Sequence, residues 1–225
     1  TGFEQTGVIQ PEAAHSYFGN VWVPGSSWGN TNGAILKLYP GSGRAPDCLV
    51  PTRHYFDLDT NEWGLTANIR SNPSAAAGGS IYFGGSIDRV FSCTNTSGGT
   101  YRSAFDMLTP STKTWSTVNT TNEIILWVYS GGFIAHLDST LLIWCPPASS
   151  QDEADQTSTG ADQHQFWAVD AAALKAGSSP SWAQLTISNP GGTWPLKTPS
   201  GYTSCGSVRW TYCPENGSCY AINGN

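Results

Sequence analysis

The stretch HYFDLDTNEW, residues 54–63, is the part of the sequence that best indicates the fold. Aromatic residues precede an aspartate, a short polar segment follows, and a tryptophan ends the stretch. Aromatic residues favour strands, while Asp and Asn favour tight turns. The stretch therefore predicts a strand, a turn and a second strand. The same order returns in SAFDMLTPSTKTW (103–115) and, more loosely, in FWAVDAAALKAGSSPSW (166–182).

The composition of the chain agrees with short strands joined by turns. Only 12% of the 225 residues are charged, and the chain contains 25 Gly and 14 Pro. Long amphipathic surface helices need many Lys and Glu residues, which are scarce here. Gly, Pro and Asn supply the backbone conformations of turns, so the sequence predicts an all-β protein.

The repeats divide the chain into an N-terminal linker or closing strand at 1–12 and a single repeat domain at 13–225. Val21, Ile81 and Leu141 each begin an apolar run, and they follow one another at intervals of 60 residues. A period of this size with about four strands per unit is typical of propeller repeats. The expected units cover about 13–66, 75–118, 127–186 and 202–225.

These units resemble kelch-type repeats and, more loosely, the propeller domain of galactose-oxidase-like proteins. Such repeats combine an apolar strand, a Gly-Gly doublet, an aromatic residue before an Asp turn, and a later Trp. The second unit matches this pattern with Gly84-Gly85, Phe105, Asp106 and Trp115. The resemblance implies a β-propeller of four-stranded antiparallel blades, in which Asp caps a turn and Trp packs between neighbouring blades.

The other units depart from the pattern at the glycine doublet. The first unit has Phe56, Asp57 and Trp63, with Pro24-Gly25 in place of the doublet. The third unit keeps Asp170 and Trp182 and has Cys145-Pro146 there, while the fourth shows Asn223-Gly224. About three and a half blades are present. Either the N-terminal strand completes a four-bladed ring, or the chain belongs to a larger protein or assembly.

Charge and hydropathy exclude two classes of partner. The net charge of −6 and the scattering of the ten Lys and Arg residues leave no basic patch, so we expect no nucleic-acid binding. No apolar run is long enough to span a bilayer. Six cysteines and the sequons at Asn95, Asn119 and Asn216 favour a secreted, cell-surface or virus-particle protein.

The cysteines predict one specific crosslink. Cys213 and Cys219 flank a short segment that contains Asn216-Gly217, a pair typical of hairpin turns. A hairpin could bring the two cysteines within bridging distance, so a disulfide between them is expected. The alternative is that the cysteines are buried free thiols, because Cys also behaves as a small apolar residue.

Residues for catalysis are harder to find. The four histidines show no metal-ligand spacing, and a G-x-S-x-G nucleophile motif is absent. The acidic insertion at 149–165 contains the candidate contact residues Asp152, Asp155 and His164. Its spacing matches no calcium loop, so we expect no metal and no cofactor. Trp28, in the 26–34 loop, is a further candidate because it lies outside the repeated framework.

The sequence favours a non-enzymatic structural or binding module that works outside the cytoplasm. Its unequal loops, chiefly 26–34, 94–100 and 149–165, are expected to contact a protein or a glycan. The alternative is a carbohydrate-active enzyme, an oxidase or hydrolase, on the same scaffold. Fold alone cannot choose between them, because propellers carry many functions.

Overall fold

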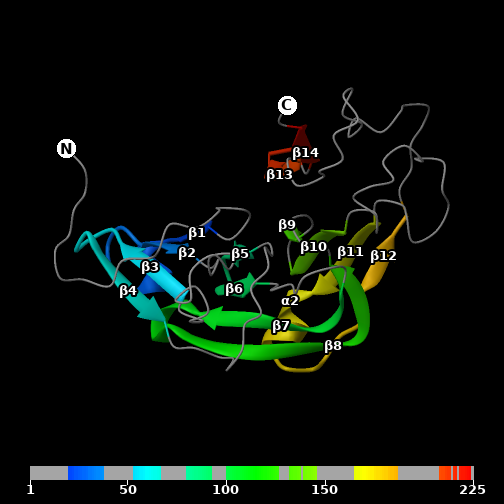
Figure 1. Cartoon of the computed structure of the whole chain (residues 1–225), viewed down its shortest axis with the longest axis horizontal. Coiled ribbons are helices and arrows are strands. Elements are labelled where there is room, and N and C mark those ends of the chain that lie inside the picture. The colour runs from blue at the N-terminus through cyan, green and yellow to red at the C-terminus, as the bar shows by residue number, and fades with distance from the viewer. Residues whose placement is uncertain are drawn as a thin grey trace, which may run out of the picture.

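The fold is described from a computed structural model of the chain, shown in Figure 1. The structure describes residues 20–37, 53–66, 80–92, 100–126, 132–137, 139–145, 165–186, 208–213, 215–216 and 218–223. Within these ranges the chain forms fourteen strands and three short helical segments. Every strand pairing between them is antiparallel. The prediction of an all-β fold built from antiparallel sheets is confirmed.

The first sheet is a meander in which each strand pairs with the next along the chain. Its strands are β1 (Asn20–Val23), β2 (Ala34–Lys37), β3 (Arg53–Asp57) and β4 (Glu62–Thr66). The stretch HYFDLDTNEW forms most of β3, the turn and the start of β4, as predicted. Asn61 in this turn has a φ of 57°, a left-handed conformation that Asn adopts more readily than most residues.

Two more four-stranded meanders and a hairpin follow. The second sheet consists of β5 (Ser80–Phe83), β6 (Arg89–Ser92), β7 (Thr100–Thr109) and β8 (Thr114–Leu126). The third consists of β9 (Gly132–Leu137), β10 (Thr140–Cys145), β11 (Gln165–Asp170) and β12 (Ala183–Leu185). The hairpin pairs β13 (Val208–Cys213) with β14 (Ser218–Asn223).

The helical segments all lie in connections between strands. They are α1 (Gly25–Trp28) in the first sheet, η2 (Pro110–Thr112) in the second and α2 (Ala171–Lys175) in the third. None of the helices in the described ranges has the length and apolar character needed to cross a bilayer.

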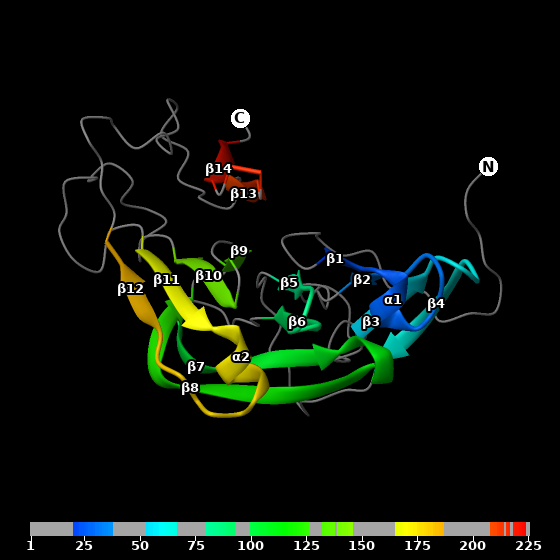
Figure 2. The same ribbon diagram turned by 180° about the vertical axis from the view of Figure 1, so that it is seen from behind.

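The first strands of successive sheets lie side by side. β1 contacts β5, β5 contacts β9, and β9 contacts β13. Figures 1 and 2 show the three sheets fanned around these strands, with β4, β8 and β12 on the outside. Each sheet therefore presents a face to the sheet that follows it.

Two apolar clusters fill the spaces between the three sheets. The first joins Val21, Val23 and Leu36 of the first sheet to Val90 and Leu108 of the second. The second and larger cluster lies between the second and third sheets. It includes Phe91, Phe105, Val118, Leu141, Val169 and Trp182. Burial of these side chains supplies the main favourable term for stacking, at roughly 25 cal/mol per Å² of apolar surface.

Two of the repeated tryptophans lie at these interfaces, as the sequence predicts. Trp182 is 3% exposed, and its ring meets Phe105 edge-on with centroids 5.4 Å apart. Trp115 packs against the first cluster, and its Nε1 donates a hydrogen bond to Thr66 Oγ1 of the first sheet over 2.8 Å. The tryptophans therefore connect each sheet to the one before it.

The expected 60-residue equivalence is wrong beyond the second unit. Val21 lies in β1 and Ile81 in β5, but Leu141 lies in β10, which is a second strand. The first strand of the third sheet is β9. Cys145-Pro146 therefore follows a second strand, whereas Gly84-Gly85 follows the first strand β5. The error arose because β9 and β10 are both apolar, so hydropathy does not distinguish them.

The role expected for Asp106 is also wrong. The strand register pairs Leu108, not Phe105, with Trp115, so Asp106 lies inside β7 rather than at the turn. Asp106 is fully buried there. Pro110, with its fixed φ, starts η2 instead, and Lys113 ends it with a φ of 55°.

Truncation of Leu108 tests the importance of sheet stacking. Leu108→Ala should lower the free energy of unfolding by about 2–5 kcal/mol, because the side chain is completely buried between two sheets. The matched control, Leu65→Ala, should cost no more than about 1 kcal/mol because Leu65 is already 37% exposed. Urea unfolding followed by circular dichroism measures both values. Equal losses would contradict this description of the core.

Candidate functional site

The connections of the three sheets separate into two groups at opposite ends of the molecule. In an antiparallel meander, connections alternate between the two ends of the sheet. We call the end that carries α1, η2 and α2 the α1 end. Contacts between neighbouring sheets confirm that these segments share it. Lys175 Nζ of α2 donates a hydrogen bond to Ser86 O, and the Lys113 ammonium lies 5.0 Å from the centre of the Trp28 ring.

Asp57 and Asn30 hold the first sheet together at the α1 end. Asp57 Oδ1 accepts hydrogen bonds from Asn30 Nδ2 and from the Asp59 amide, both over 3.0 Å. The Asn30 side chain also donates to Gly33 O and accepts from Gly33 N. Gly33 has a φ of 89°, and a Cβ there would collide with Val23 O. Asp57 therefore caps the turn, as expected from the sequence, and also anchors the β1–β2 connection.

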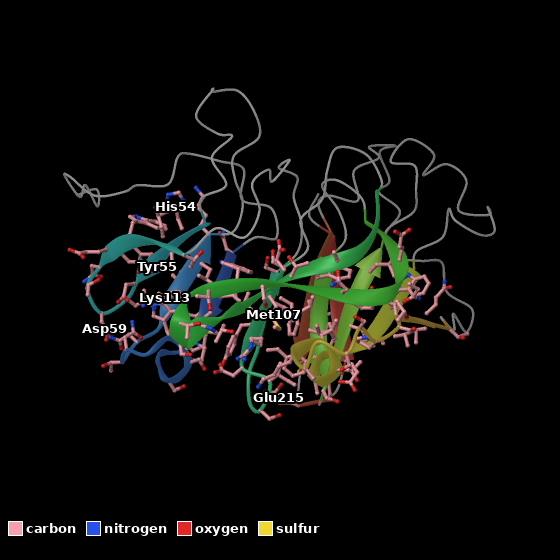
Figure 3. All side chains as sticks on the ribbon, turned by 90° about the horizontal axis from the view of Figure 1, so that it is seen from below. His54, Tyr55, Asp59, Met107, Lys113 and Glu215 are labelled. Carbon is pink, nitrogen blue, oxygen red and sulfur yellow. The ribbon has the colours of Figure 1, made fainter. Side chains whose placement is uncertain are left out.

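The exposed Asp59 side chain also binds the β1–β2 connection. Its carboxylate accepts hydrogen bonds from the amides of Thr31 (2.7 Å) and Asn32 (2.8 Å). The bond from the Thr31 amide is the main cause that lowers the pKa of Asp59 below its usual value. A carboxylate satisfied in this way serves the local backbone rather than a ligand. Figure 3 shows Asp59 and Glu215 toward the same edge of the molecule, with His54 toward the other.

Trp28 is buried rather than available to a ligand. Its side chain is 2% exposed and meets the Tyr55 ring edge-on, with centroids 4.8 Å apart. Lys113 of the second sheet covers both rings, with its Nζ 5.0 Å from Trp28 and 5.6 Å from Tyr55. This cation–π contact joins the first two sheets. The expectation that Trp28 contacts a ligand is therefore wrong, because the side chain fills the core beside α1.

A chain of hydroxyl groups joins the same two sheets nearby. Ser27 Oγ and Tyr82 OH are 2.6 Å apart, and Tyr82 OH donates to Asp88 Oδ1 over 3.0 Å. Burial raises the pKa of Tyr82 above its usual value. Tyr82 therefore remains protonated at neutral pH and holds α1 against β5.

The search for a metal site covers the acidic, histidine and cysteine side chains of the described residues. Within the described ranges, no group of three or more His, Cys, Asp or Glu side chains could hold a metal ion. The carboxylates at the α1 end bind backbone amides or neighbouring side chains. This end is thus built mainly of interactions within the protein.

The structure does not describe the other predicted contact residues. Asp152, Asp155 and His164 lie outside the described residues, between the end of β10 and the start of β11. Those strand ends are opposite the α1 end, because β11 runs from there to α2. The strand ends that carry the 94–100 and 149–165 connections thus lie at the end of the sheets opposite the 26–34 loop. The contacts expected of those loops stay predictions.

The predicted Cys213–Cys219 disulfide is wrong. The hairpin register places Cys213 opposite Ser218 and Cys219 opposite Tyr212, so the two cysteines are not cross-strand partners. Cys213 is a free thiol, and its Sγ donates a hydrogen bond to Glu215 Oε2 over 2.9 Å. That bond lowers the pKa of Glu215. The sequence predicted the turn correctly but not the strand register. A disulfide across the hairpin needs the two cysteines opposite each other, and the observed register is offset from that arrangement by one residue.

The outer face of the first sheet, which the sequence analysis missed, carries an exposed apolar row. Trp22, Ile35, Phe56 and Trp63 are successive cross-strand partners, and we call them the outer row. Trp22 is 57% and Ile35 40% exposed, and the rings of Phe56 and Trp63 lie 5.2 Å apart. The signal was the run Val21–Val23, in which buried valines flank Trp22 and so place it on the other face.

No protein-family model matches this chain, and no curated protein matches its sequence.

The Asp59 hydrogen bonds predict a specific pH dependence. Wild type should be more stable than Asp59→Asn at neutral pH, since the folded state favours the charged carboxylate. This advantage is complete above the unfolded pKa, about 3.9, and is lost as the pH falls through the lower folded value. Urea unfolding at a series of pH values should show the difference shrinking toward low pH. A difference independent of pH would contradict the assignment.

The state of Cys213 can be tested separately. Alkylation under denaturing conditions without a reductant should modify Cys213, as peptide mass spectrometry can detect. Cys213→Ser should change the free energy of unfolding by less than about 1 kcal/mol, whereas losing a native disulfide costs about 2–5 kcal/mol. Recovery of a peptide that links Cys213 to Cys219 would contradict the free thiol.

Proposed function

We propose that this chain is a non-enzymatic structural or binding module built on a kelch-type β-propeller. Three observations support the propeller. Each sheet is a four-stranded antiparallel meander, the first strands of successive sheets lie side by side, and the repeated Trp115 and Trp182 pack against the preceding sheet. On this proposal the β13–β14 hairpin is the inner half of a fourth blade.

The lengths of the connections support a partner at the end opposite the α1 end. In each of the three sheets, the longest connection joins the second strand to the third. These connections are 38–52, 93–99 and 146–164. The described strand ends that carry them lie at the same end of neighbouring sheets, which supports a common partner for the three connections. Binding residues are commonly found on loops carried by a rigid scaffold.

The α1 end also supports this proposal, because its polar groups already have partners within the protein. Its connections are held by backbone and side-chain hydrogen bonds around Asp57, Asp59 and Asp170. Polar groups that already have partners gain little from a ligand. We therefore assign recognition to the other end and a structural role to this one.

We further propose that the protein works outside the cytoplasm and contacts a protein or glycan. The low charge, the six cysteines and the three sequons support this location. Two sequon residues, Asn119 and Asn216, are exposed. The acidic segment with Asp152, Asp155 and His164 is the largest difference between the three equivalent connections, so it is the strongest candidate for a specific contact.

Replacement of that segment tests the proposed function. The full chain is applied to a panel of immobilised glycans and to glycoproteins before and after deglycosylation. A variant with residues 149–162 replaced by a Gly/Ser linker should bind at least about tenfold more weakly, if the segment supplies a binding hot spot. Its thermal midpoint should stay near that of wild type, because long surface loops tolerate replacement.

The control is Ser111→Asp, an exposed change at the α1 end, which should bind like wild type. Loss of binding on deglycosylation identifies a glycan, and retention identifies a protein surface. Mass spectrometry of the glycans after incubation should show no chemical change. Chemical conversion of a glycan, or equal binding by the loop variant and wild type, would contradict the proposal.

A further inference from the structure

One sequon stands on the outer strand of the second sheet. Asn119, Thr120 and Thr121 form an N-x-T triplet in β8, the strand at the edge of that sheet. β8 lies on the outside of the fan of sheets in Figures 1 and 2. The Asn119 side chain is exposed, whereas Val118 and Thr120 on either side of it are buried. The alternation of the strand therefore directs the Asn119 amide group into solvent.

The two sequon asparagines that the structure describes differ in how their side chains are used. Asn216 Nδ2 donates a hydrogen bond to Tyr220 OH over 2.7 Å, and its Oδ1 accepts one from Ser218 N over 3.1 Å. Both ends of the Asn216 amide thus hold the β13–β14 hairpin. The Asn119 side chain makes no hydrogen bond with the rest of the described residues. Its Nδ2 is therefore available for a covalent attachment.

The strand ladder is interrupted directly after Asn119. Asn119 pairs with Ala104, but the next paired residue of β8 is Ile124, which lies opposite Arg102. Residues 120–123 therefore bulge out of the ladder. Bulges at the edge of a sheet change the direction of side chains and end regular pairing. A bulky group on the exposed Asn119 side chain needs no displacement of β7.

The bulge itself holds the third sheet. Thr121 N donates a hydrogen bond to Pro180 O over 3.1 Å, and Asn122 Oδ1 accepts one from Trp182 N over 2.7 Å. These contacts give Thr121 and Asn122 a structural role of their own. They do not involve the Asn119 side chain, so they do not account for an asparagine at that position.

The outer edge of β8 is the part of the second sheet that a covering group would protect. β8 has 13 residues, and β7 is its only partner strand among the described residues. Long exposed edge strands can pair with another chain, and proteins block them with charges, bulges or covering segments. A glycan on asparagine is bulky and polar, so it can serve the same purpose. Asn119 lies near the middle of β8, where such a group covers the edge on both sides.

We propose that Asn119 is the attachment site of an N-linked glycan that covers the outer edge of β8. The inference rests on the proposed location outside the cytoplasm, where an asparagine can meet a lipid-linked oligosaccharide. Asn119 Nδ2 forms a bond to C1 of the donor's first sugar and gives up one proton. The bond between C1 and the lipid pyrophosphate breaks, and the pyrophosphate leaves with the electron pair. Thr121 supplies the hydroxyl group that the triplet requires.

A chain with a single sequon tests the attachment. Asn95→Gln and Asn216→Asp remove the other two triplets, and aspartate keeps an acceptor for the Ser218 amide. The full chain is secreted from a eukaryotic host behind a cleavable signal. It should migrate as a larger species on a denaturing gel, and peptide-N-glycosidase should abolish the increase. In heavy-oxygen water the enzyme should leave a labelled aspartate at position 119, which peptide mass spectrometry detects.

Three further substitutions are the controls. In the single-sequon chain, Asn119→Gln should abolish the gel shift, whereas Thr121→Ser should keep it, because serine completes the triplet and retains a hydroxyl group beside Ser181. In the chain without sequons, Thr112→Asn creates a triplet with Thr114 in the exposed η2 connection. A shift there shows that the host modifies this protein. Circular dichroism should show a native spectrum for each variant.

Two results would overturn the attachment site: an unmodified Asn119 in a secreted chain when Thr112→Asn is modified, or a shift that persists in Asn119→Gln. The protective role is tested on the native glycoprotein by light scattering before and after enzymatic removal of the glycan. Association should rise on removal, and unchanged scattering would contradict that role. Occupancy is read from the Asn119 peptide and recognition from partner binding by the 149–162 variant, so either proposal can fail without the other.

Discussion

The stacking of one sheet face on the next is the interaction on which the rest of this structure depends. A four-stranded meander has two faces, and neither the backbone pairing nor the turns bury the apolar side chains on them. Burial of Leu36, Leu108, Leu141 and Trp182 requires a neighbouring sheet. The units therefore stabilise each other, and among the described residues the first sheet keeps an exposed apolar face formed by the outer row.

Contacts at the α1 end determine how neighbouring sheets are aligned. Lys113 reaches across to Trp28 and Tyr55, Tyr82 links Ser27 to Asp88, and Lys175 bonds to the backbone of Ser86. These contacts are directional, whereas apolar burial is not, so they select one alignment among the many that would bury similar area. Asx-type bonds from Asp57 and Asp170 then hold the connections that carry the contacting residues.

The polar groups at the α1 end mainly hold the connections and sheets in place. Carboxylates and hydroxyl groups at the α1 end have partners supplied by the protein itself, and a buried tyrosine with a raised pKa remains neutral. The longest connections join strand ends at the opposite end of the sheets. The proposed function assigns recognition to those connections, apart from the framework that stacks the sheets.

The sequence alone determined the local features of this protein. The repeated aromatic–Asp–Trp order predicted three strand–turn–strand units, the capping role of Asp57 and Asp170, and the packing of Trp115 and Trp182 between sheets. These follow from side-chain chemistry within a few residues. The sequence did not distinguish β9 from β10, and it did not show the role of the buried Asp106 or of Trp28.

Only the tertiary structure determined the strand register, the end of the sheet at which each connection leaves, and the exposure of side chains. The one-residue offset between Cys213 and Cys219 removes a disulfide that their spacing allowed. The alternation of connections between two ends places the 26–34 loop at the end opposite the described ends of β10 and β11. The alternation of Trp22 with Val21 and Val23 indicates opposite faces of the strand, but it does not show which of the two faces another sheet covers. Each outcome depends on which strand lies beside which, and that pairing is set by contacts between residues far apart in the chain, which local patterns do not encode.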